Sequence, residues 1–273
     1  MKADKPRRDE EEGPPTAKRA GRRPKSADGA PALSRESVVQ CAIELARREP
    51  LSDLSMVRVA RELGVAPGLI HYYLGSRDDL LSRVINYAFK ERVDALPRLT
   101  GDWRADLEGV ARSAVEVTAR WPGLGTYILT HNRFRLFQRV GPGETDFGLA
   151  FFDHIGRILK DAGFTSTQAA LGYHLLMLFI TSISAEVENR QAPGTHHDYI
   201  VGYVSRFDRT EVPGATYLVS SFAKLDTANT FEAGLRLVLD GFAAWLEPAE
   251  AGQGTRPSER KKSSRVGGRK AGE

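Results

Sequence analysis

The sequence contains a single cysteine, Cys41, in 273 residues. An intrachain disulfide is therefore impossible, and this pattern is typical of proteins in a reducing compartment. The fold must instead come from an apolar core, for which a chain of this length is sufficient. We expect Cys41 to be a small buried residue on a helix, and a redox-sensing thiol is the alternative.

The charged N-terminal segment lacks the apolar stretch that signal peptides contain, so we expect a cytoplasmic protein. One internal segment, 162–185, has no charged residue, and this raises the question of a membrane span. Its apolar part is only about seventeen residues long, at the lower limit for crossing a bilayer. We therefore predict a soluble helix that is buried on all sides, and no membrane partner.

A large net charge is also missing, because the chain carries only four more basic than acidic side chains. The excess lies at the two ends. Residues 1–33 carry nine basic and six acidic side chains, and residues 247–273 carry seven and four. Both ends are rich in Pro, Gly, Ala and charge, so they cannot bury enough apolar surface to order themselves. We predict a disordered basic arm at 1–33 and a disordered basic tail at 247–273.

Strand-like alternation is almost absent between these ends, whereas apolar residues with helical spacing are common. The pattern predicts an all-α protein. We assign an N-terminal three-helix helix-turn-helix domain to 34–80 and a larger helical ligand-binding and dimerisation domain to 81–246. We expect neither an enzyme, a metal site nor a cofactor, because a G-x-S-x-G motif, a phosphate-binding loop and a paired metal box are all missing.

Short breaks divide the N-terminal domain. Ser34 and Ser55 are candidate caps for helices at 35–48 and 56–63, and Gly64 suits the left-handed position that closes a helix. A proline in the first turn then opens a helix at 67–73.

A second break separates this short helix from a long one. Gly75 ends the short helix, and the S-x-x-D pattern of Ser76 and Asp79 predicts a capping box for a helix to about residue 96. Helix, tight glycine turn and helix is the helix-turn-helix arrangement that places its second helix in the major groove of DNA.

The short helix has an aromatic face that a core does not need. Ile70 and Leu74 can anchor it, while its tyrosine hydroxyls and imidazole N–H groups can reach phosphates and base edges. A plain surface cluster of aromatic residues on a helical hairpin is the alternative. The free N–H groups at the start of the next helix also favour a phosphate near Arg77.

Residues 34–80 resemble the DNA-binding domain of the tetracycline-repressor (TetR) family of bacterial transcription regulators. The shared positions are Ser55, Val59-Ala60, Gly64-Val65, Ile70, His71, Tyr72, Tyr73, Leu74 and Arg77. Three positions depart from the family pattern: His71 replaces a phosphate-contacting tyrosine, Leu74 replaces phenylalanine, and Ala66 replaces a capping serine.

The resemblance implies a dimer that binds double-stranded operator DNA and is controlled by a small molecule. We expect the following residues at the DNA: Ser55, Arg58, Pro67, Gly68, Leu69, His71, Tyr72, Tyr73 and Arg77, with Arg22, Arg23 and Lys25 of the arm.

Residues 100–246 are similar, more loosely, to the C-terminal domain of the tetracycline-repressor branch, in which two helices pair with their copies. Two capping boxes, Thr165–Gln168 and Asn229–Glu232, predict the start of these helices. The second helix has apolar residues at steps of four and three, which is a coiled-coil seam, and simple core packing is the alternative. We expect the homodimer contact at Leu171, Leu175, Leu178, Phe231, Leu235, Val238, Phe242 and Trp245.

Aromatic and soft side chains on the remaining helices are candidates for an effector pocket, although core aromatics give the same pattern. They are Trp103, Trp121, Tyr127, His131, Phe134, Phe151, His174 and Met177. We expect a ligand-responsive dimeric repressor with a palindromic operator, released by a mostly apolar, ring-containing molecule. An architectural DNA-binding protein without a ligand is the alternative, and loss of operator binding on addition of a ligand separates the two.

Deletion of residues 1–33 tests the basic arm. Five basic residues within 18–25 can follow the narrow, negative minor groove beside each half-site. Each phosphate that they neutralise adds about 0.9 to the slope of log affinity against log salt. The truncated protein should bind operator more weakly, with a flatter slope, and keep its base preference. Unchanged affinity and slope in salt titrations by fluorescence anisotropy would make the arm a solubilising tail.

Overall fold

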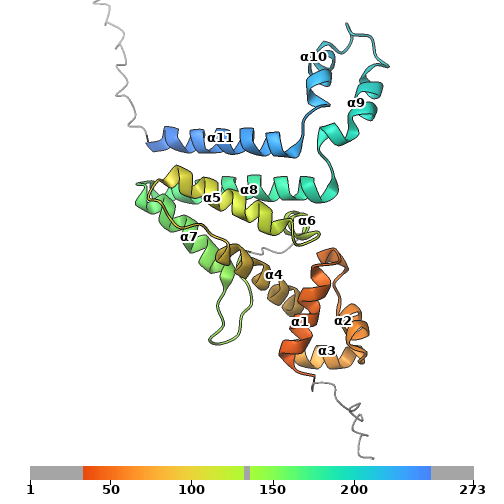
Figure 1. Ribbon diagram of the computed structural model, residues 1–273, viewed down its shortest axis with the longest axis vertical. Helices are drawn as coiled ribbons and strands as arrows, with labels where there is room; N and C mark the ends of the chain where they lie inside the picture. The colour runs from red at the N-terminus through yellow and green to blue at the C-terminus, as the bar shows by residue number, and fades with distance from the viewer. Residues whose placement is uncertain (1–32, 132–135, 247–273) are drawn as a thin grey trace, which may run out of the picture. The chain divides into compact units, whose positions relative to one another are not determined.

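The computed structural model describes residues 33–131 and 136–246, and this part of the chain is helical without a strand (Figure 1). The predicted all-α class is therefore confirmed. The predicted arm and tail, with Arg22, Arg23, Lys25 and Phe134, lie outside the described residues.

The first helices follow the predicted order with small shifts at their ends. They are α1 (Arg35–Ala46), the short 3₁₀ turn η1 (Leu51–Asp53), α2 (Met56–Leu63), α3 (Pro67–Leu74) and α4 (Arg77–Asp94). The predicted caps at Ser55 and Ser76 are confirmed. The Ser55 hydroxyl accepts from the Arg58 N–H at 3.1 Å, and Ser76 and Asp79 form a complete capping box. Gly64 closes α2 with a φ of 67°, in the left-handed region that favours glycine.

Cys41 lies in the core of this part of the chain. Its side chain is 8% exposed, and burial raises the pKa of its thiol. A protonated, buried thiol reacts slowly, which favours the structural interpretation over the redox one.

The helix α4 serves two cores. It packs against α1 and also against α5 and α7. Leu80 and Val84 are fully buried in the first half, and Ala88 and Phe89 are buried in the second. The domain boundary that we predicted after residue 80 therefore falls inside one continuous helix.

The larger helical part consists of α5 (Trp103–Thr118), α6 (Leu124–Thr130), α7 (Phe147–Asp161), α8 (Ser166–Asn189) and α11 (Thr227–Leu246). Asp102, Asp146 and Thr165 cap α5, α7 and α8 with their side chains. The helix α6 begins at Leu124. Pro122 and Gly123 set its start, because Gly123 has a φ of 73° and tightens the turn.

Close approach of α8 and α11 depends on two glycines. A Cβ atom on Gly234 would lie 2.5 Å from the Phe179 ring, and one on Gly172 would lie 3.4 Å from the Phe242 ring. The predicted capping box at Asn229 and Glu232 is wrong. The helix begins at Thr227, Asp226 accepts from the Asn229 N–H at 2.8 Å, and Glu232 pairs with Arg112 on α5.

The prediction that α8 is buried on all sides is also wrong. One face is buried through Leu176 and Ile180, whereas Leu171, Leu175 and Leu178 are between 39% and 47% exposed. By length and composition alone, an apolar window within residues 166–204 could also span a membrane, and a third of that window is buried. The helix is therefore amphipathic in its packing, with an apolar face that the protomer leaves open.

Between α8 and α11 the chain forms a small helical hairpin. It comprises η2 (Pro193–His196), α9 (His197–Val204) and α10 (Pro213–Phe222), and α9 and α10 contact one another (Figure 1). The rings of Tyr199, Tyr203 and Phe207, which are four residues apart, follow each other at 6.1 and 5.6 Å. Neither α9 nor α10 contains a buried residue.

The Glu188 carboxylate binds the start of α6, and substituting it tests how much these hydrogen bonds stabilise the fold. Its carboxylate accepts from the backbone N–H groups of Gly125 and Thr126 at 2.8 and 2.9 Å and from the Thr126 hydroxyl at 2.8 Å. Because hydrogen bonds to a charged group contribute about 1.5–3 kcal/mol, Glu188→Ala should lower the free energy of unfolding by roughly that amount. Glu188→Gln, which keeps one acceptor, should lose less.

Urea unfolding at one fixed protein concentration measures both Glu188 variants. Glu116→Gln, at an exposed position on α5 paired only with Arg120, is the control and should be nearly neutral. Equal stability of Glu188→Ala and the control would show that α6 is held by packing alone.

Candidate DNA-binding surface and effector core

The pair α2–α3 has the geometry of a helix-turn-helix. Val59 and Ala60 on α2 and Ile70 and Leu74 on α3 are at most 3% exposed, so the two helices are fixed by their inner faces. The outer face of α3 is exposed at His71 and Tyr72, as predicted. The module therefore presents one short helix to its surroundings.

The exposed face of α3 is aromatic. Tyr72 is 81% exposed, and its ring meets the half-buried Tyr73 ring edge-on at 5.4 Å. His71 is exposed, and its Nδ1 lies 3.0 Å from the Gly75 carbonyl oxygen, which can only accept, so Nδ1 is the donor in this contact. This fixed ring position gives the shorter histidine a defined direction where the resembled family has tyrosine.

At the start of α3, Pro67 has no N–H and the Leu69 N–H donates to the Ala66 carbonyl oxygen at 2.9 Å. Ala66 provides no side-chain cap, Pro67 occupies the first turn, and Gly68 is exposed. Leu69 is half-buried at the edge of the face. An uncapped helix start with a positive dipole end favours an anion such as a phosphate.

Arg58 does not have the role that we predicted. Its guanidinium is held by Glu49 at 2.6 Å and Glu62 at 2.9 Å, and its Nε also donates to Glu49. The hydrogen bonds from Arg58 hold the pKa of both carboxyls below their usual values. Arg58 therefore ties α2 to the end of α1, and its donors are not free for DNA.

Arg77 is a second correction. Its Nε donates to the Leu54 carbonyl oxygen at 2.9 Å, and its Nη2 donates to the Ser52 carbonyl oxygen at 3.0 Å. These contacts fasten the start of α4 to the turn before α2. Sequence spacing placed Arg77 correctly near the helix-turn-helix but could not show that Nε and Nη2 donate to backbone carbonyl groups.

The predicted effector residues do not form one cluster. Trp103 meets Phe164 at 5.4 Å, Tyr127 stacks on His131 at 4.3 Å, and Phe151 is fully buried beside Phe89 at 6.2 Å. Met177 is half-buried, whereas His174 is exposed, which contradicts its expected place in a pocket wall. Because α8 is apolar on most sides, its sequence does not show which face is buried. His174 lies outside the buried face.

Trp121 lies at the junction of the two cores rather than in a pocket. Its Nε1 donates to Glu91 at 3.0 Å, and the Arg47 guanidinium lies 4.6 Å from its ring. Arg47 also pairs with Glu91. One indole thus links α1, α4 and the turn before α6.

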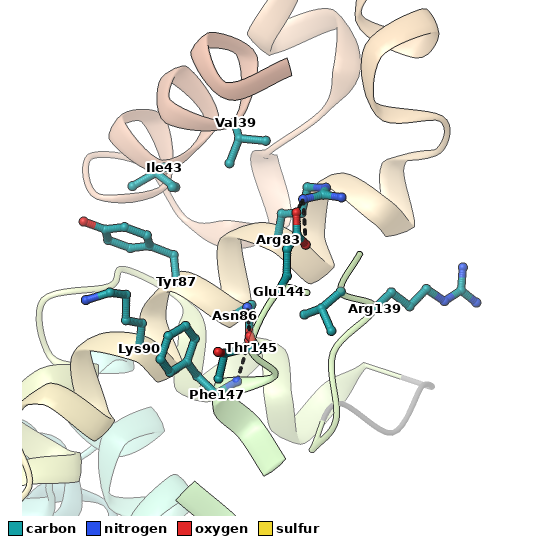
Figure 2. A pocket seen from close by; sticks show the side chains of 11 residues that line it. Val39, Ile43, Arg83, Asn86, Tyr87, Lys90, Arg139, Glu144, Thr145 and Phe147 are labelled. Carbon is teal, nitrogen blue, oxygen red and sulfur yellow. Dashed lines mark hydrogen bonds and ion pairs between the residues drawn. The ribbon is translucent and has the colours of Figure 1, made fainter. Parts of the chain in front are cut away.

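A cavity of about 310 Å³ lies beside α4, and Figure 2 shows side chains of α1, α4 and residues 139–147 around it. Its apolar wall comes from Val39, Ile43 and Phe147. Two of the basic side chains there form ion pairs. Arg83 pairs with Glu144 at 3.3 Å, and Lys90 pairs with Asp94. The predicted effector residues are not among those that line it.

Most of the predicted seam of α11 packs inside the protomer. Phe231, Leu235 and Phe242 are between 2% and 8% exposed, and Phe231 stacks on Phe179 at 5.9 Å. They cannot carry a contact with a second copy. Val238 and Trp245 are half-buried, whereas Leu237, which the prediction left out, is 72% exposed. The apolar residues of α11 do share one face, as their spacing of four and three predicted. That face packs mainly in the core of the protomer.

Comparison with known proteins gives two matching family models. One, described as bacterial regulatory proteins of the tetR family, matches residues 39–84. The other, described as a tetracyclin repressor-like C-terminal domain, matches residues 96–246.

Two curated relatives are repressors. The HTH-type transcriptional repressor Rv1353c of Mycobacterium tuberculosis is 32% identical over 132 residues, which are 48% of this chain and 51% of that protein. The HTH-type transcriptional repressor DrrR1 of Streptomyces coeruleorubidus is 33% identical over 126 residues, covering 46% and 44%. The chain thus spans about half the length of the curated relatives that it matches.

Solved structures share the fold over most of the chain. ActR of Streptomyces coelicolor in complex with actinorhodin has a TM-score of 0.66 and 26% identity, covering 80% of this chain and all of that chain. BioQ with its double-stranded DNA operator has a TM-score of 0.53 and 17% identity, covering 78% and 99%, and shows the fold alone.

Arg77→Met separates the two roles of this side chain. It keeps the aliphatic length and removes both hydrogen bonds to the carbonyl groups, so the free energy of unfolding should fall by about 1.5–3 kcal/mol. Arg61→Met, at an exposed position on α2, is the control and should change it by less than about 0.5 kcal/mol. Full stability of Arg77→Met in urea unfolding, together with lost DNA binding, would restore the phosphate role.

Proposed function

Because the chain belongs to the tetracycline-repressor family of bacterial transcriptional regulators, we propose that it is a homodimeric repressor that binds a palindromic operator and is released by a small molecule. The observation that carries the proposal is the exposed aromatic face of α3 at Tyr72 and His71, beside a helix start that has no side-chain cap. Such a helix fits the major groove, with the Gly68 N–H for a phosphate and tyrosine hydroxyls for phosphates or base edges.

The DNA contacts that we propose are narrower than the set predicted from the sequence. The proposed groove contacts come from three side chains, Tyr72, His71 and Tyr73. At the start of the same helix, the backbone at Pro67 and Gly68 comes close to a phosphate. Ser55 and Leu69 lie at the margin of this surface. Arg58 and Arg77 support it from behind by fixing α2 and the start of α4, so their effect on DNA binding is indirect.

The proposed effector is a ring-containing and mostly apolar molecule. ActR, which shares the fold and 26% identity with this chain, is described in complex with actinorhodin and with (S)-DNPA. The helices α4 to α8 of the present chain contain many aromatic side chains, which suit a molecule with rings. Binding of the effector shifts a two-state equilibrium only if it binds the released state more tightly than the DNA-bound state.

We propose that the dimer forms through α8 and α11. The exposed stripe of Leu171, Leu175 and Leu178 supports this, because an apolar row of this kind on a long helix fits a partner helix. Leu237 of α11 replaces Phe231, Leu235 and Phe242 as the proposed contact. The repressor would act in the cytoplasm, where the DNA is.

Tyr72→Ala tests the DNA-binding face. The side chain is 81% exposed, so its removal should leave the melting temperature unchanged. Loss of its contact should weaken operator binding by about 1–3 kcal/mol per half-site. Fluorescence anisotropy with a duplex selected from a random library measures this, and Leu99→Ala, another exposed side chain, is the control. Equal affinity of Tyr72→Ala and wild type would contradict the assignment of α3 as the recognition helix.

Leu175→Glu tests the dimer. A charge in the middle of the exposed stripe would be buried without a partner in the dimer but solvated in the monomer, so the variant should be a folded monomer. Sedimentation velocity and circular dichroism measure both properties. Glu116→Lys, on the surface of α5, should remain dimeric. A fully dimeric Leu175→Glu would move the interface away from α8.

A further inference from the structure

A fully buried cation lies in the core of the larger helical part. Arg92 of α4 is 2% exposed, and its guanidinium lies 4.9 Å from the Phe89 ring and 6.0 Å from the Phe151 ring of α7. Its Nη2 donates to the Thr118 hydroxyl of α5 at 2.5 Å, and that hydroxyl donates onward to the Ala114 carbonyl oxygen. The guanidinium is therefore held in place by rings and one neutral acceptor.

Within the described part of the chain, the Arg92 guanidinium lacks a counter-ion and one hydrogen-bond partner. Arg92 Nε is buried without a hydrogen-bond partner, and Arg92 has no carboxylate within 4.0 Å among residues 33–131 and 136–246. Glu188 is near enough to stabilise the positive charge, but its oxygens are taken by the start of α6. Burial of a charge without a counter-ion is costly, and an apolar side chain of the same length would avoid this cost.

Arg92 remains charged at neutral pH. Burial lowers its pKa to about 10, which is still well above 7. The nearby Tyr173 of α8 has its pKa raised by burial to about 12, so its hydroxyl keeps a proton that it can donate. The core thus holds a positive charge and a neutral hydroxyl, and both are suited to an anion.

A row of three aromatic rings, Phe137, Phe152 and Tyr173, connects the surface with the residues near Arg92. Phe137 is 48% exposed and meets Phe152 of α7 edge-on at 5.8 Å, and Phe152 meets Tyr173 at 4.6 Å. Phe152 itself is 37% exposed. Half-exposed rings that lie edge-on offer apolar faces to another ring.

We propose that the effector carries an anionic group, such as a carboxylate, sulfonate or phenolate, that binds the Arg92 guanidinium while its rings lie against Phe152 and Tyr173. This proposal rests on the proposed function and names the chemistry of the molecule that releases the repressor. The anion would satisfy the open donor of Arg92 and neutralise its charge, so binding would be strongest in the conformation that lets it reach the core.

Arg92 also lies on a helix that connects the proposed anion site with the N-terminal helices. Arg92 lies on α4, and the same helix packs against α1. An anion at Arg92 would therefore bind to a helix that also supports the helix-turn-helix.

The test uses two dyes that share the same rings. 8-Anilinonaphthalene-1-sulfonate has an anionic sulfonate, whereas N-phenyl-1-naphthylamine lacks it and is neutral. Fluorescence titration of the full chain gives the affinity of each dye for wild type, Arg92→Met and Arg92→Lys. Arg92→Met should weaken binding of the sulfonate by about tenfold or more, roughly 1.4 kcal/mol, and leave the neutral dye within about twofold. Arg92→Lys, which keeps the charge, should recover part of the loss.

Phe152→Ala tests the position of the rings. Because this side chain is partly exposed, the variant should fold, and both dyes should bind more weakly by a similar factor. Circular dichroism, sedimentation and operator affinity check that each variant is a folded, DNA-binding protein. Arg92→Met should be at least as stable as wild type without ligand, because it removes a buried charge that has no counter-ion.

Three results would overturn the proposal: no binding of the sulfonate dye by wild type, equal loss of both dyes in Arg92→Met, or unchanged affinity for the sulfonate in that variant. Unchanged binding of both dyes in Phe152→Ala would overturn the placement of the rings. These outcomes are separate from the proposed function, which fails instead if the wild-type protein binds no operator in the same preparation.

Discussion

The burial of α4 in two cores at once is the constraint on which the rest of the structure depends. Val84 and Ile85 pack near Ala46 and Leu51 of the N-terminal part, while Phe89 and Arg92 pack near α5 and α7. The helix has eighteen residues, so it is about 27 Å long. A rigid helix of this length cannot shift in one core without shifting in the other.

The junction around α4 is polar as well as apolar, so its helices are held by directional hydrogen bonds as well as by packing. Trp121 and Arg47 meet over Glu91, and the Leu51 N–H donates to the Pro122 carbonyl oxygen at 3.1 Å. On the other side, Asn86 exchanges hydrogen bonds with the backbone of Thr145 and Phe147 (Figure 2). Under the proposed function, an effector would release the DNA only if it binds more tightly to an arrangement in which some of these contacts have changed.

The local signals in the sequence predicted the helices well. Caps at Ser55, Ser76 and Thr165 and the left-handed Gly64 are decided by neighbouring residues, so short patterns are sufficient to find them. The last helix was harder, because Asp226 offered a better cap than Asn229 and only the structure shows which one binds. The hairpin helix α10 was missed, because a Pro-Gly start followed by a short apolar run does not distinguish a helix from a loop.

The side chains of the site were harder to predict than the helices. Arg58 and Arg77 have long side chains that reach partners nine and more than twenty residues away, and sequence spacing does not encode those partners. Phe231, Leu235 and Phe242 show that one apolar stripe suits a protomer core and a dimer seam equally well. Arg92 was overlooked because a basic residue within a helix is normally exposed, and only its burial reveals it.

A hydroxyl-radical footprint of the purified protein on the DNA that flanks its own gene tests the central claim most directly. A dimer that places two copies of α3 in successive major grooves predicts two protected half-sites of inverted sequence. Their centres should lie about 10 base pairs apart, or a multiple of one helical turn. Protection of a single unpaired site, or uniform protection that is independent of sequence, would contradict the account of this chain as a dimeric operator-binding repressor.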